Sequence, residues 1–479
     1  MAVTFLTDAD RAELERMILE HTGGAVTIES ILMSSEDGGE NIVTFSDGST
    51  LTVRNGQTGK NGTSVKINDV VEQVGQDGVI SNILAFSDGT TLTVTNGKDG
   101  EDRVEVPAEN FNIPVLSMTG DISAMDKDNA VTLNYVYGER TGTLMCKWQG
   151  SSSLSYPKKN YTIKFDEAFE AKEGWGAQKK YCLKANWIDA SNIRNLFGAT
   201  IWGKMVKKRE GADTRLAALP KGGAVDGFPV WVKINGEDIG LYTFNIPKDA
   251  WMFGMTGTNS NEGILCAENV DMRNPVVCDK TDMEIEYSAS EDTTALVASI
   301  NNLISVINNV QSEADLAAVE AVLDVNSVVD YYILSCLMAH YDGIVKNWLI
   351  ATYDGTKWFM SAYDMDSTFG NKWDGSGIKW ASDWPYFSDL NTSAIFDLVR
   401  NWYPERLKAR YQQLKDWTLS EIDLLYGLYD IAKSFPAELV ARDNRLWPTR
   451  PGTMTNNIEQ IIWWFRLRFP KLDYNITTI

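Results

Sequence analysis

The chain has 479 residues, of which 44% are hydrophobic and 23% charged, an ordinary composition for a globular protein of two or three domains. Its formal net charge of −21 argues against a basic surface, so we expect neither nucleic acid nor membrane as a partner. Five scattered cysteines without a Cys-x-x-Cys pair, and only two histidines, argue against a disulfide scaffold, a zinc site or a multi-histidine metal site. Cys266 and Cys278 could pair, but we expect free buried thiols.

The first 24 residues predict a docking helix and no targeting segment. There is no basic start with an apolar core, so we expect no signal peptide, and no run reaches the roughly 18 apolar residues of a membrane helix. Thr7 and Asp10 resemble a capping box, and the stripe Leu14, Met17 and Ile18 predicts a helix up to Glu20. One helix cannot bury such a stripe alone, so it docks on a partner chain or on its own domain.

An internal repeat with an offset of 41 residues follows. Residues 41–53 and 82–94 each contain two alternating runs around Ser-Asp-Gly, which predicts two β-hairpins. Each hairpin is followed by glycines at every third position, too few for a collagen helix. Such tandem hairpins resemble the small β-modules of phage tail fibres, which are often trimers. We therefore interpret residues 25–106 as a stalk, with a flexible spacer as the alternative.

From Pro107 onward the sequence predicts strands alternating with helices. A strand at 144–148, a loop of small residues and a strand at 161–165 come first, and small residues let backbone N–H groups approach phosphates. The candidate nucleotide-binding residues in this segment are Gly150, Ser151, Ser152, Lys159 and Lys164. Alternation places Lys164 on one strand face, like the nucleotide lysine of protein kinases, although a solvated surface lysine is the alternative.

Further elements lead to a helical C-terminal part. Residues 230–244 predict a hairpin that turns at Asn-Gly, and apolar spacing predicts helices near 293–310 and 326–340. Three more helices are expected in the last 85 residues or so, and they would form a helical lobe. Their expected ranges are 397–417, 419–434 and 457–469.

The most informative stretch runs from His340 to Asp366. Asp342 is followed five residues later by Asn347, and a predicted hairpin with an Asp-Gly turn then leads to Asp364. Protein kinases use this order of base, amide and metal-binding acid. We therefore expect Asp342 to be the catalytic base, Asn347 and Asp364 to bind Mg²⁺, and Asp366 to be a second candidate for the metal. The alternative is that these side chains only bond to their own loops.

Several motifs in this order resemble the CotH-type spore-coat kinase family. They are the Gly-x-Ser-Ser loop with Pro-Lys-Lys-x-Tyr-x-Ile-Lys-Phe, the segment 183–195, the Asp342 to Asn347 loop, and Tyr-Asp-Met-Asp-Ser-Thr-Phe-Gly at 363–370. The resemblance covers roughly residues 110–400. It implies an atypical protein-kinase-like fold that binds ATP and phosphorylates Ser or Thr, and it implies nothing about residues 1–106.

The sequence also departs from the protein-kinase pattern. Tyr341 stands where kinases have the Arg of His-Arg-Asp, the small-residue loop has one glycine, and the acidic motif is Asp-Met-Asp. No glutamate partner for Lys164 can be identified, although Glu167 and Glu173 are near it in sequence. These departures keep an inactive kinase-fold module as an alternative. Three tryptophans follow the acidic motif and either stack on a sugar or adenine or pack the loop, namely Trp373, Trp380 and Trp384.

The sequence therefore predicts an α+β protein with a docking helix (1–24), a stalk of all-β hairpin repeats (25–106) and a two-lobed kinase-like domain with a mostly helical C-terminal lobe (107–479). The expected function is that of a phage or virion structural protein, of tail or fibre, carrying an ATP- and Mg²⁺-dependent Ser/Thr kinase-like domain. Its expected partners are other virion proteins, further copies of itself in a trimer, and a protein substrate. The alternatives are an inactive binding module and a cellular spore-coat-like kinase.

Overall fold

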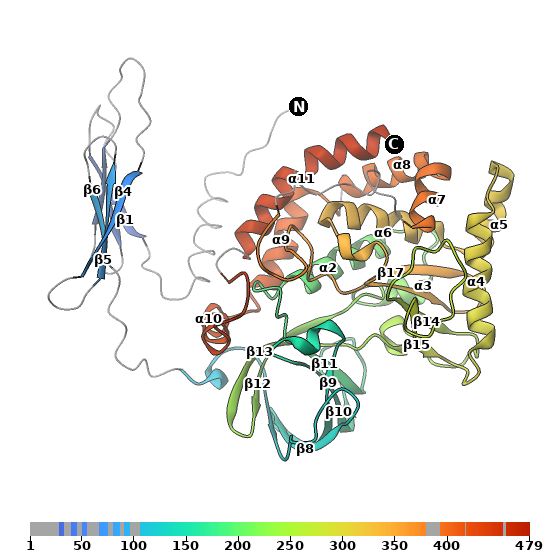
Figure 1. Cartoon of the computed structure of the whole chain (residues 1–479), viewed down its shortest axis with the longest axis horizontal. Helices are drawn as coiled ribbons and strands as arrows, with labels where there is room; N and C mark the ends of the chain where they lie inside the picture. Colours follow the sequence, from blue (N-terminus) through green and yellow to red (C-terminus); the bar gives the residue numbers. More distant parts are fainter. Residues whose placement is uncertain are drawn as a thin grey trace. The chain divides into compact units, whose positions relative to one another are not determined.

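The computed structural model describes residues 106–379, 393–416, 418–453 and 457–479, together with the backbone of six strands before them. It divides the chain into two units, Met1–Phe111 and Asn112–Ile479 (Figure 1). The helix expected at 7–20, the glycine-rich tails of the repeats, Trp380 and Trp384 lie outside the described residues.

The first unit contains two three-stranded sheets of the same design. One has the order β1-β2-β3 and the other β4-β5-β6, and all neighbouring strands are antiparallel. Asn41 pairs with Val53 and Asn82 pairs with Val94, so both predicted hairpins are confirmed. The first strand of each sheet was not predicted. The strands are β1 (Ile28–Leu32), β2 (Glu40–Phe45), β3 (Thr50–Arg54), β4 (Ile67–Val74), β5 (Ile80–Phe86) and β6 (Thr91–Thr95).

The second unit begins with a closed barrel of seven strands in the order β10-β11-β13-β12-β7-β8-β9 (Figure 1). Only β12 and β7 are parallel to each other. The mixed α+β class is confirmed, whereas a kinase-like arrangement of two lobes stays a prediction because the strand-rich part is a barrel. The strands are β7 (Val115–Thr119), β8 (Val131–Tyr137), β9 (Arg140–Gln149), β10 (Asn160–Phe169), β11 (Gln178–Lys184), β12 (Gly227–Ile234) and β13 (Glu237–Asn245).

Aromatic side chains fill the barrel. Along β10, Ile163 and Phe165 are buried while Lys164 between them is exposed, as the two-residue period of a strand requires. The Phe165 ring lies 6.0 Å from that of Tyr181, which in turn lies 4.7 Å from that of Phe244. Rings of this size bury much apolar surface and so close a small barrel around a solid core.

A second sheet and a group of helices complete the unit. The sheet has the order β15-β14-β16-β17, and helix α6 packs against it with nearly every side chain buried. Most of the helices gather on the side of the unit away from the barrel (Figure 1). The strands are β14 (Gly263–Ala267), β15 (Met283–Ser288), β16 (Trp348–Thr352) and β17 (Trp358–Ala362). The helices are α2 (Arg194–Lys207), α3 (Thr214–Ala218), α4 (Thr294–Asn308), α5 (Leu316–Val322), α6 (Val325–Met338), α7 (Ala394–Trp402), α8 (Pro404–Lys415), α9 (Glu421–Ala432), α10 (Ala437–Leu446) and α11 (Ile458–Thr478).

The state of the cysteines and the character of the helices can be compared with what the composition led us to expect. All five cysteines are free, and all but Cys278 are buried, so the expectation of free thiols is confirmed. Among the described residues, no helix combines the length and the apolar character needed to cross a membrane.

A buried ionic network joins the barrel to the helices through Asp443 of α10. Its carboxylate accepts hydrogen bonds from Lys158 Nζ at 2.8 and 2.9 Å, from the backbone N–H of Leu241 at 2.9 Å and from Arg450 at 3.0 Å. The side chains of Asp443, Lys158 and Arg450 are fully buried. Two cations and one carboxylate hold one another in place here, so the loss of the carboxylate would leave both cations uncompensated.

We expect Asp443→Ala to destabilise the folded chain by about 3–5 kcal/mol, the usual cost of removing one partner from a buried ion pair. Chemical denaturation would measure the loss. The control is Glu405→Gln, since Glu405 pairs with Lys408 on an exposed face, and it should leave stability unchanged. Equal stability of Asp443→Ala and the control would show that the network does not hold the barrel to α10.

Candidate active site

The loop between α6 and β16 carries the first predicted site residues. Ala339 follows α6 in a left-handed conformation (φ 49°) that turns the chain, and a single 3₁₀ turn, η5 (Tyr341–Gly343), then presents Asp342. Asn347 Nδ2 donates a hydrogen bond to Asp342 Oδ2 at 3.3 Å. Since the amide nitrogen takes this contact, Asn347 Oδ1 is left without a partner among the described residues and can face a cation.

The β16–β17 hairpin returns the second acidic segment to the same place. Trp348 pairs with Ala362, so Asn347 just before β16 and Asp364 just after β17 meet at one end of the hairpin. Both residues have left-handed backbones, with φ of 60° for Asn347 and 49° for Asp364. Non-glycine residues in this conformation are uncommon, and strained backbone clusters at functional sites. The structure thus brings Asp342, Asn347 and Asp364 together.

Asp366 adds a further carboxylate to this acidic cluster, which we define as Asp342, Asp364 and Asp366. Burial raises the pKa of Asp366 well above its usual range, and the neighbouring carboxylate of Asp364 adds to the effect. Asp189 and Asp342 raise the pKa further, whereas Lys184 opposes the shift. Carboxylates gathered in this way share protons or bind a cation, because like charges at short range disfavour full ionisation.

The small-residue loop reaches the acidic cluster through Tyr156. Burial raises the pKa of the Tyr156 hydroxyl, and so do the carboxylates of the cluster, with Asp366 contributing most among them. The Tyr156 ring stacks on Trp187 with 5.9 Å between centroids. Gly150 has φ 127°, and a Cβ there would lie 2.0 Å from Ser153 Oγ, so the loop requires glycine at this position.

Of the side chains predicted to contact phosphate in this loop, two serines are exposed to solvent and one lysine already donates hydrogen bonds to the loop itself. Ser151 and Ser152 are exposed to solvent. Lys159 Nζ donates to the carbonyl oxygens of Leu154 at 2.7 Å and Tyr156 at 2.5 Å. Lys159 therefore holds the loop in shape, and its ammonium would have to leave these carbonyls in order to reach a phosphate.

Comparison with known protein families matches residues 147–468, about two thirds of the chain, to the family described as CotH kinase protein. The chain belongs to the CotH kinase family. The matched range includes every predicted site residue from Gly150 to Asp366. A search of curated proteins found no match to the chain.

The buried lysine that interacts with the acidic cluster of this CotH kinase domain is Lys184, not the predicted Lys164. Lys164 is exposed and pairs across the barrel wall with Lys180. Lys184 lies on the same face of β11 but four residues beyond Lys180, which is about 13 Å further along the strand. The structure therefore separates Lys164 from Asp364. Glu167 and Glu173, the glutamates near Lys164 in sequence, are exposed to solvent.

Lys184 faces the acidic cluster directly. Burial works against its charged form, but the neighbouring Tyr363 hydroxyl and the carboxylates of Asp364 and Asp366 outweigh burial, so the pKa of Lys184 is raised. Among the described residues, no carboxylate lies within ion-pairing distance of Lys184 Nζ. A charged lysine that is held near carboxylates but bound to none of them is free to contact an anionic ligand. Sequence reasoning placed Lys184 in the motif segment 183–195 but assigned it no role, because nothing local shows that it lies near Asp364.

Residues of the CotH segment 183–195 form hydrogen bonds with the backbone of the loop that carries Asp364 and Asp366. Asn195 Oδ1 accepts a hydrogen bond from the backbone N–H of Met365 at 2.6 Å, between the two site aspartates. Arg194 is buried and donates to Asp189 Oδ1 at 2.7 Å and to the carbonyl of Thr368 at 2.9 Å. These contacts fix the backbone on both sides of Asp366, which explains why residues so far apart in sequence form one motif.

His340 is a further buried group beside the predicted base. Its side chain is fully buried, and among the described residues its nearest polar neighbours are the backbones of Asn347 and Tyr363, which do not reach either ring nitrogen with full hydrogen-bond geometry. Burial lowers the pKa of His340, although Asp342 opposes the shift, so the ring is neutral at pH 7. A Cβ at Gly343 would lie 2.2 Å from this ring, so the imidazole packs directly beneath the turn that carries Asp342.

The side chains available for a metal are oxygen donors. Within the described part of the chain, no group of three or more His, Cys, Asp or Glu side chains is placed to hold a metal ion by itself. Asn347 Oδ1 and the carboxylates of Asp364 and Asp366 are hard ligands of the kind that Mg²⁺ prefers, and this cation usually completes its shell with waters and substrate phosphates. The donor set therefore fits Mg²⁺ that arrives with a nucleotide, and metal binding stays a prediction.

Proposed function

We propose that this member of the CotH kinase family transfers the γ-phosphate of ATP to a serine or threonine hydroxyl of a protein, with Mg²⁺ as cofactor. The observation that carries the proposal is that Asp342, Asn347 and Asp364 lie together with Lys184, a cation that forms no ion pair within the described residues. Phosphoryl transfer depends on positioned charge more than on covalent chemistry, and this arrangement supplies both signs of charge.

Each residue has a separate task in this proposal. Asp342, held by Asn347 at 3.3 Å and by Lys346 at 3.2 Å, accepts the proton of the attacking hydroxyl. Asn347 and Asp364 hold the metal, with Asp366 beside them, and bound Mg²⁺ offsets the negative charge of the phosphates. Lys184 replaces the predicted Lys164 as the donor to the phosphate oxygens.

Calorimetry with ATP and Mg²⁺ on two lysine variants tests this proposal. Lys184→Met should weaken ATP binding by at least about tenfold, since a hydrogen bond to a charged group contributes about 1.5–3 kcal/mol. The matched control is Lys164→Met on the same barrel face, which should bind ATP like the unchanged protein. A larger loss in Lys164→Met would restore the original prediction, and wild-type protein that binds no ATP would favour an inactive binding module.

We further propose that the chain is a virion structural protein of tail or fibre type. The support is the pair of three-stranded sheets with the same strand order in the first unit, because modules of fewer than about 40 residues rarely bury enough surface to be stable alone. Association of several chains provides the missing burial, and a trimer is the favoured number. Light scattering on the full chain at micromolar concentration should therefore report an oligomer, and a monomer would contradict the stalk interpretation.

A further inference from the structure

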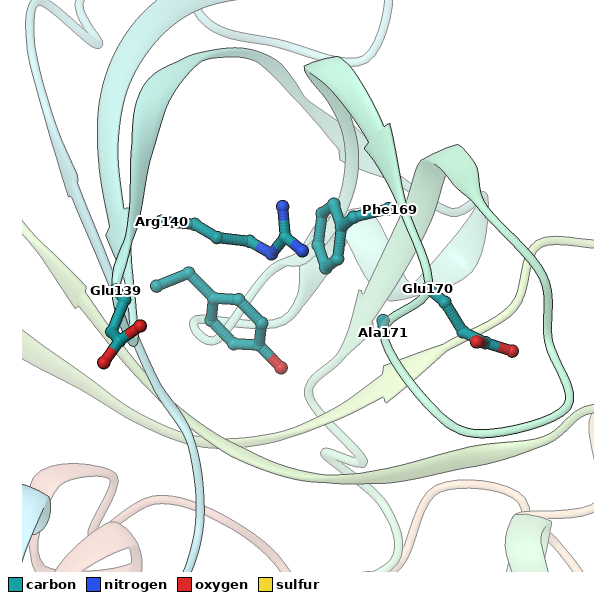
Figure 2. Close-up of a pocket in the computed structure, with 6 residues that line it drawn as sticks. Glu139, Arg140, Phe169, Glu170 and Ala171 are labelled. Atoms are coloured by element: carbon teal, nitrogen blue, oxygen red, sulfur yellow. The ribbon is translucent and has the colours of Figure 1, made fainter.

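A cavity of about 490 Å³ opens at one end of the barrel, away from the acidic cluster. It lies where β8 ends at Tyr137, β9 begins at Arg140 and β10 ends at Phe169 (Figure 2). The opposite end of β10 begins at Asn160, beside Lys184, so the cavity and the proposed kinase site are separated by the length of the strand, about 30 Å. The residues that line it are Tyr137, Glu139, Arg140, Phe169, Glu170 and Ala171.

The floor and rim of this cavity are rigid. The Tyr137 ring stacks on Phe244 with 5.8 Å between centroids, and Tyr181 Oη donates to the carbonyl of Phe169 at 2.6 Å. Glu170 accepts hydrogen bonds from two backbone N–H groups of the following loop, at 2.9 Å each. A pocket built on such fixed groups is largely formed before a ligand arrives.

Three polar groups of the cavity are left for a ligand. The Arg140 guanidinium lies over the Phe169 ring, with Cζ 4.7 Å from its centroid (Figure 2), and forms no ion pair within the described residues. Glu139 likewise has no cationic partner there, and the Tyr137 hydroxyl has no hydrogen bond to the described residues. Burial raises the pKa of Tyr137, so its hydroxyl remains a neutral donor. Two donors and one acceptor therefore line one hollow with an aromatic floor.

The charges select the class of ligand. A simple anion would be attracted by Arg140 but repelled by the carboxylates of Glu139 and Glu170. A simple cation would be repelled by Arg140 at close range. A neutral ligand with many hydroxyl groups avoids both penalties, since each hydroxyl can donate and accept. The apolar face of a sugar ring also matches an aromatic floor. A volume of about 490 Å³ is sufficient for one or two sugar units.

We propose that this cavity binds a neutral carbohydrate, such as the end of a glycan chain. Arg140 and Tyr137 donate hydrogen bonds to sugar oxygens, and Glu139 accepts one from a sugar hydroxyl. The stack on Phe169 fixes the guanidinium in one orientation, which reduces the entropy lost on binding. The site is independent of the proposed kinase chemistry.

Saturation-transfer NMR on the full chain tests this inference with a panel of neutral disaccharides, namely cellobiose, maltose, lactose and chitobiose, each at about 10 mM to detect millimolar affinity. At least one should bind, and Arg140→Leu and Tyr137→Phe should each weaken it about tenfold, the effect of one lost hydrogen bond. Lys164→Met, on the outer barrel face, and Asp342→Asn, in the proposed kinase site, should bind it like the unchanged protein.

Three results would overturn the inference. The first is binding of no member of the panel. The second is tighter binding of sodium phosphate or putrescine than of any sugar, with sensitivity to Arg140→Leu, which would make the cavity an ion site. The third is sugar binding that neither Arg140→Leu nor Tyr137→Phe changes, since the sugar would then lie elsewhere on the protein.

Discussion

Asp342→Asn is expected to slow phosphate transfer from labelled ATP to a protein hydroxyl by about 10²-fold or more, the usual contribution of a positioned general base. ATP affinity should change little, because the proposed ATP contacts are made by Lys184 and by the metal ligands. The variant keeps the size of the side chain and its place near Asn347. Transfer to the chain itself and to candidate protein substrates would be measured with Mg²⁺ and with Mn²⁺.

A matched control lies on the same hairpin. Asp354 occupies the β16–β17 turn, where its carboxylate accepts the backbone N–H groups of Thr356 and Lys357 at 2.7 and 2.8 Å. Both N–H groups donate to Oδ1, an acceptor that asparagine keeps, so Asp354→Asn should transfer phosphate like the unchanged protein. If Asp342→Asn retained full transfer, Asp342 would not be the base. If the unchanged protein transferred no phosphate, the inactive module would be the better account.

Asp364→Ala is expected to abolish Mg²⁺-dependent ATP binding, as measured by calorimetry. The reason is that Asp364 and Asn347 flank one hairpin and provide the proposed metal ligands. Alanine adopts the left-handed backbone of Asp364 less readily than aspartate does, so the melting temperature of the variant should be measured alongside.

Asp366→Ala separates the two candidate metal aspartates. This substitution removes the carboxylate that neighbours Asp364 and leaves Asp364 in place, so ATP binding should persist if Asp364 is the principal ligand. Loss of ATP binding in Asp366→Ala with normal binding in Asp364→Ala would transfer the metal role to Asp366. Normal binding in both variants would contradict a metal site at this hairpin.

Local patterns in the sequence predicted the elements well where neighbouring residues determine them. The hairpins at 41–53 and 82–94, the strand around Lys164 and the helix before Asp342 all follow from alternation, turn residues or apolar spacing. The expected helix at 397–417 is interrupted at Tyr403, where Pro404 begins α8. Helix α10 was not predicted, since only two of its side chains are buried.

Long-range features could not be read from these patterns. The barrel closes through the parallel pairing of β12 with β7, between residues more than 100 positions apart, and no local signal specifies that partner. The site shows the same limit. The order of Asp342, Asn347 and Asp364 around one hairpin predicted that they lie close together. The alternation of buried and exposed residues predicted which face of the strand carries Lys164, but not how far Lys164 lies from the acidic cluster. Which end of that face meets the acidic cluster depends on the packing of α2 and the loop at Met365.

The central claim is that the acidic cluster with Lys184 binds ATP together with Mg²⁺. The most direct test is the melting temperature of the full chain with ATP and Mg²⁺, compared with ATP and a chelator. A ligand that binds only the folded state adds about 2.7 kcal/mol of stability when its concentration is a hundred times its Kd. Because the proposed site binds ATP only together with Mg²⁺, the melting temperature should rise with ATP and Mg²⁺ and not with ATP and the chelator. Equal melting temperatures with and without Mg²⁺ and ATP would contradict the account.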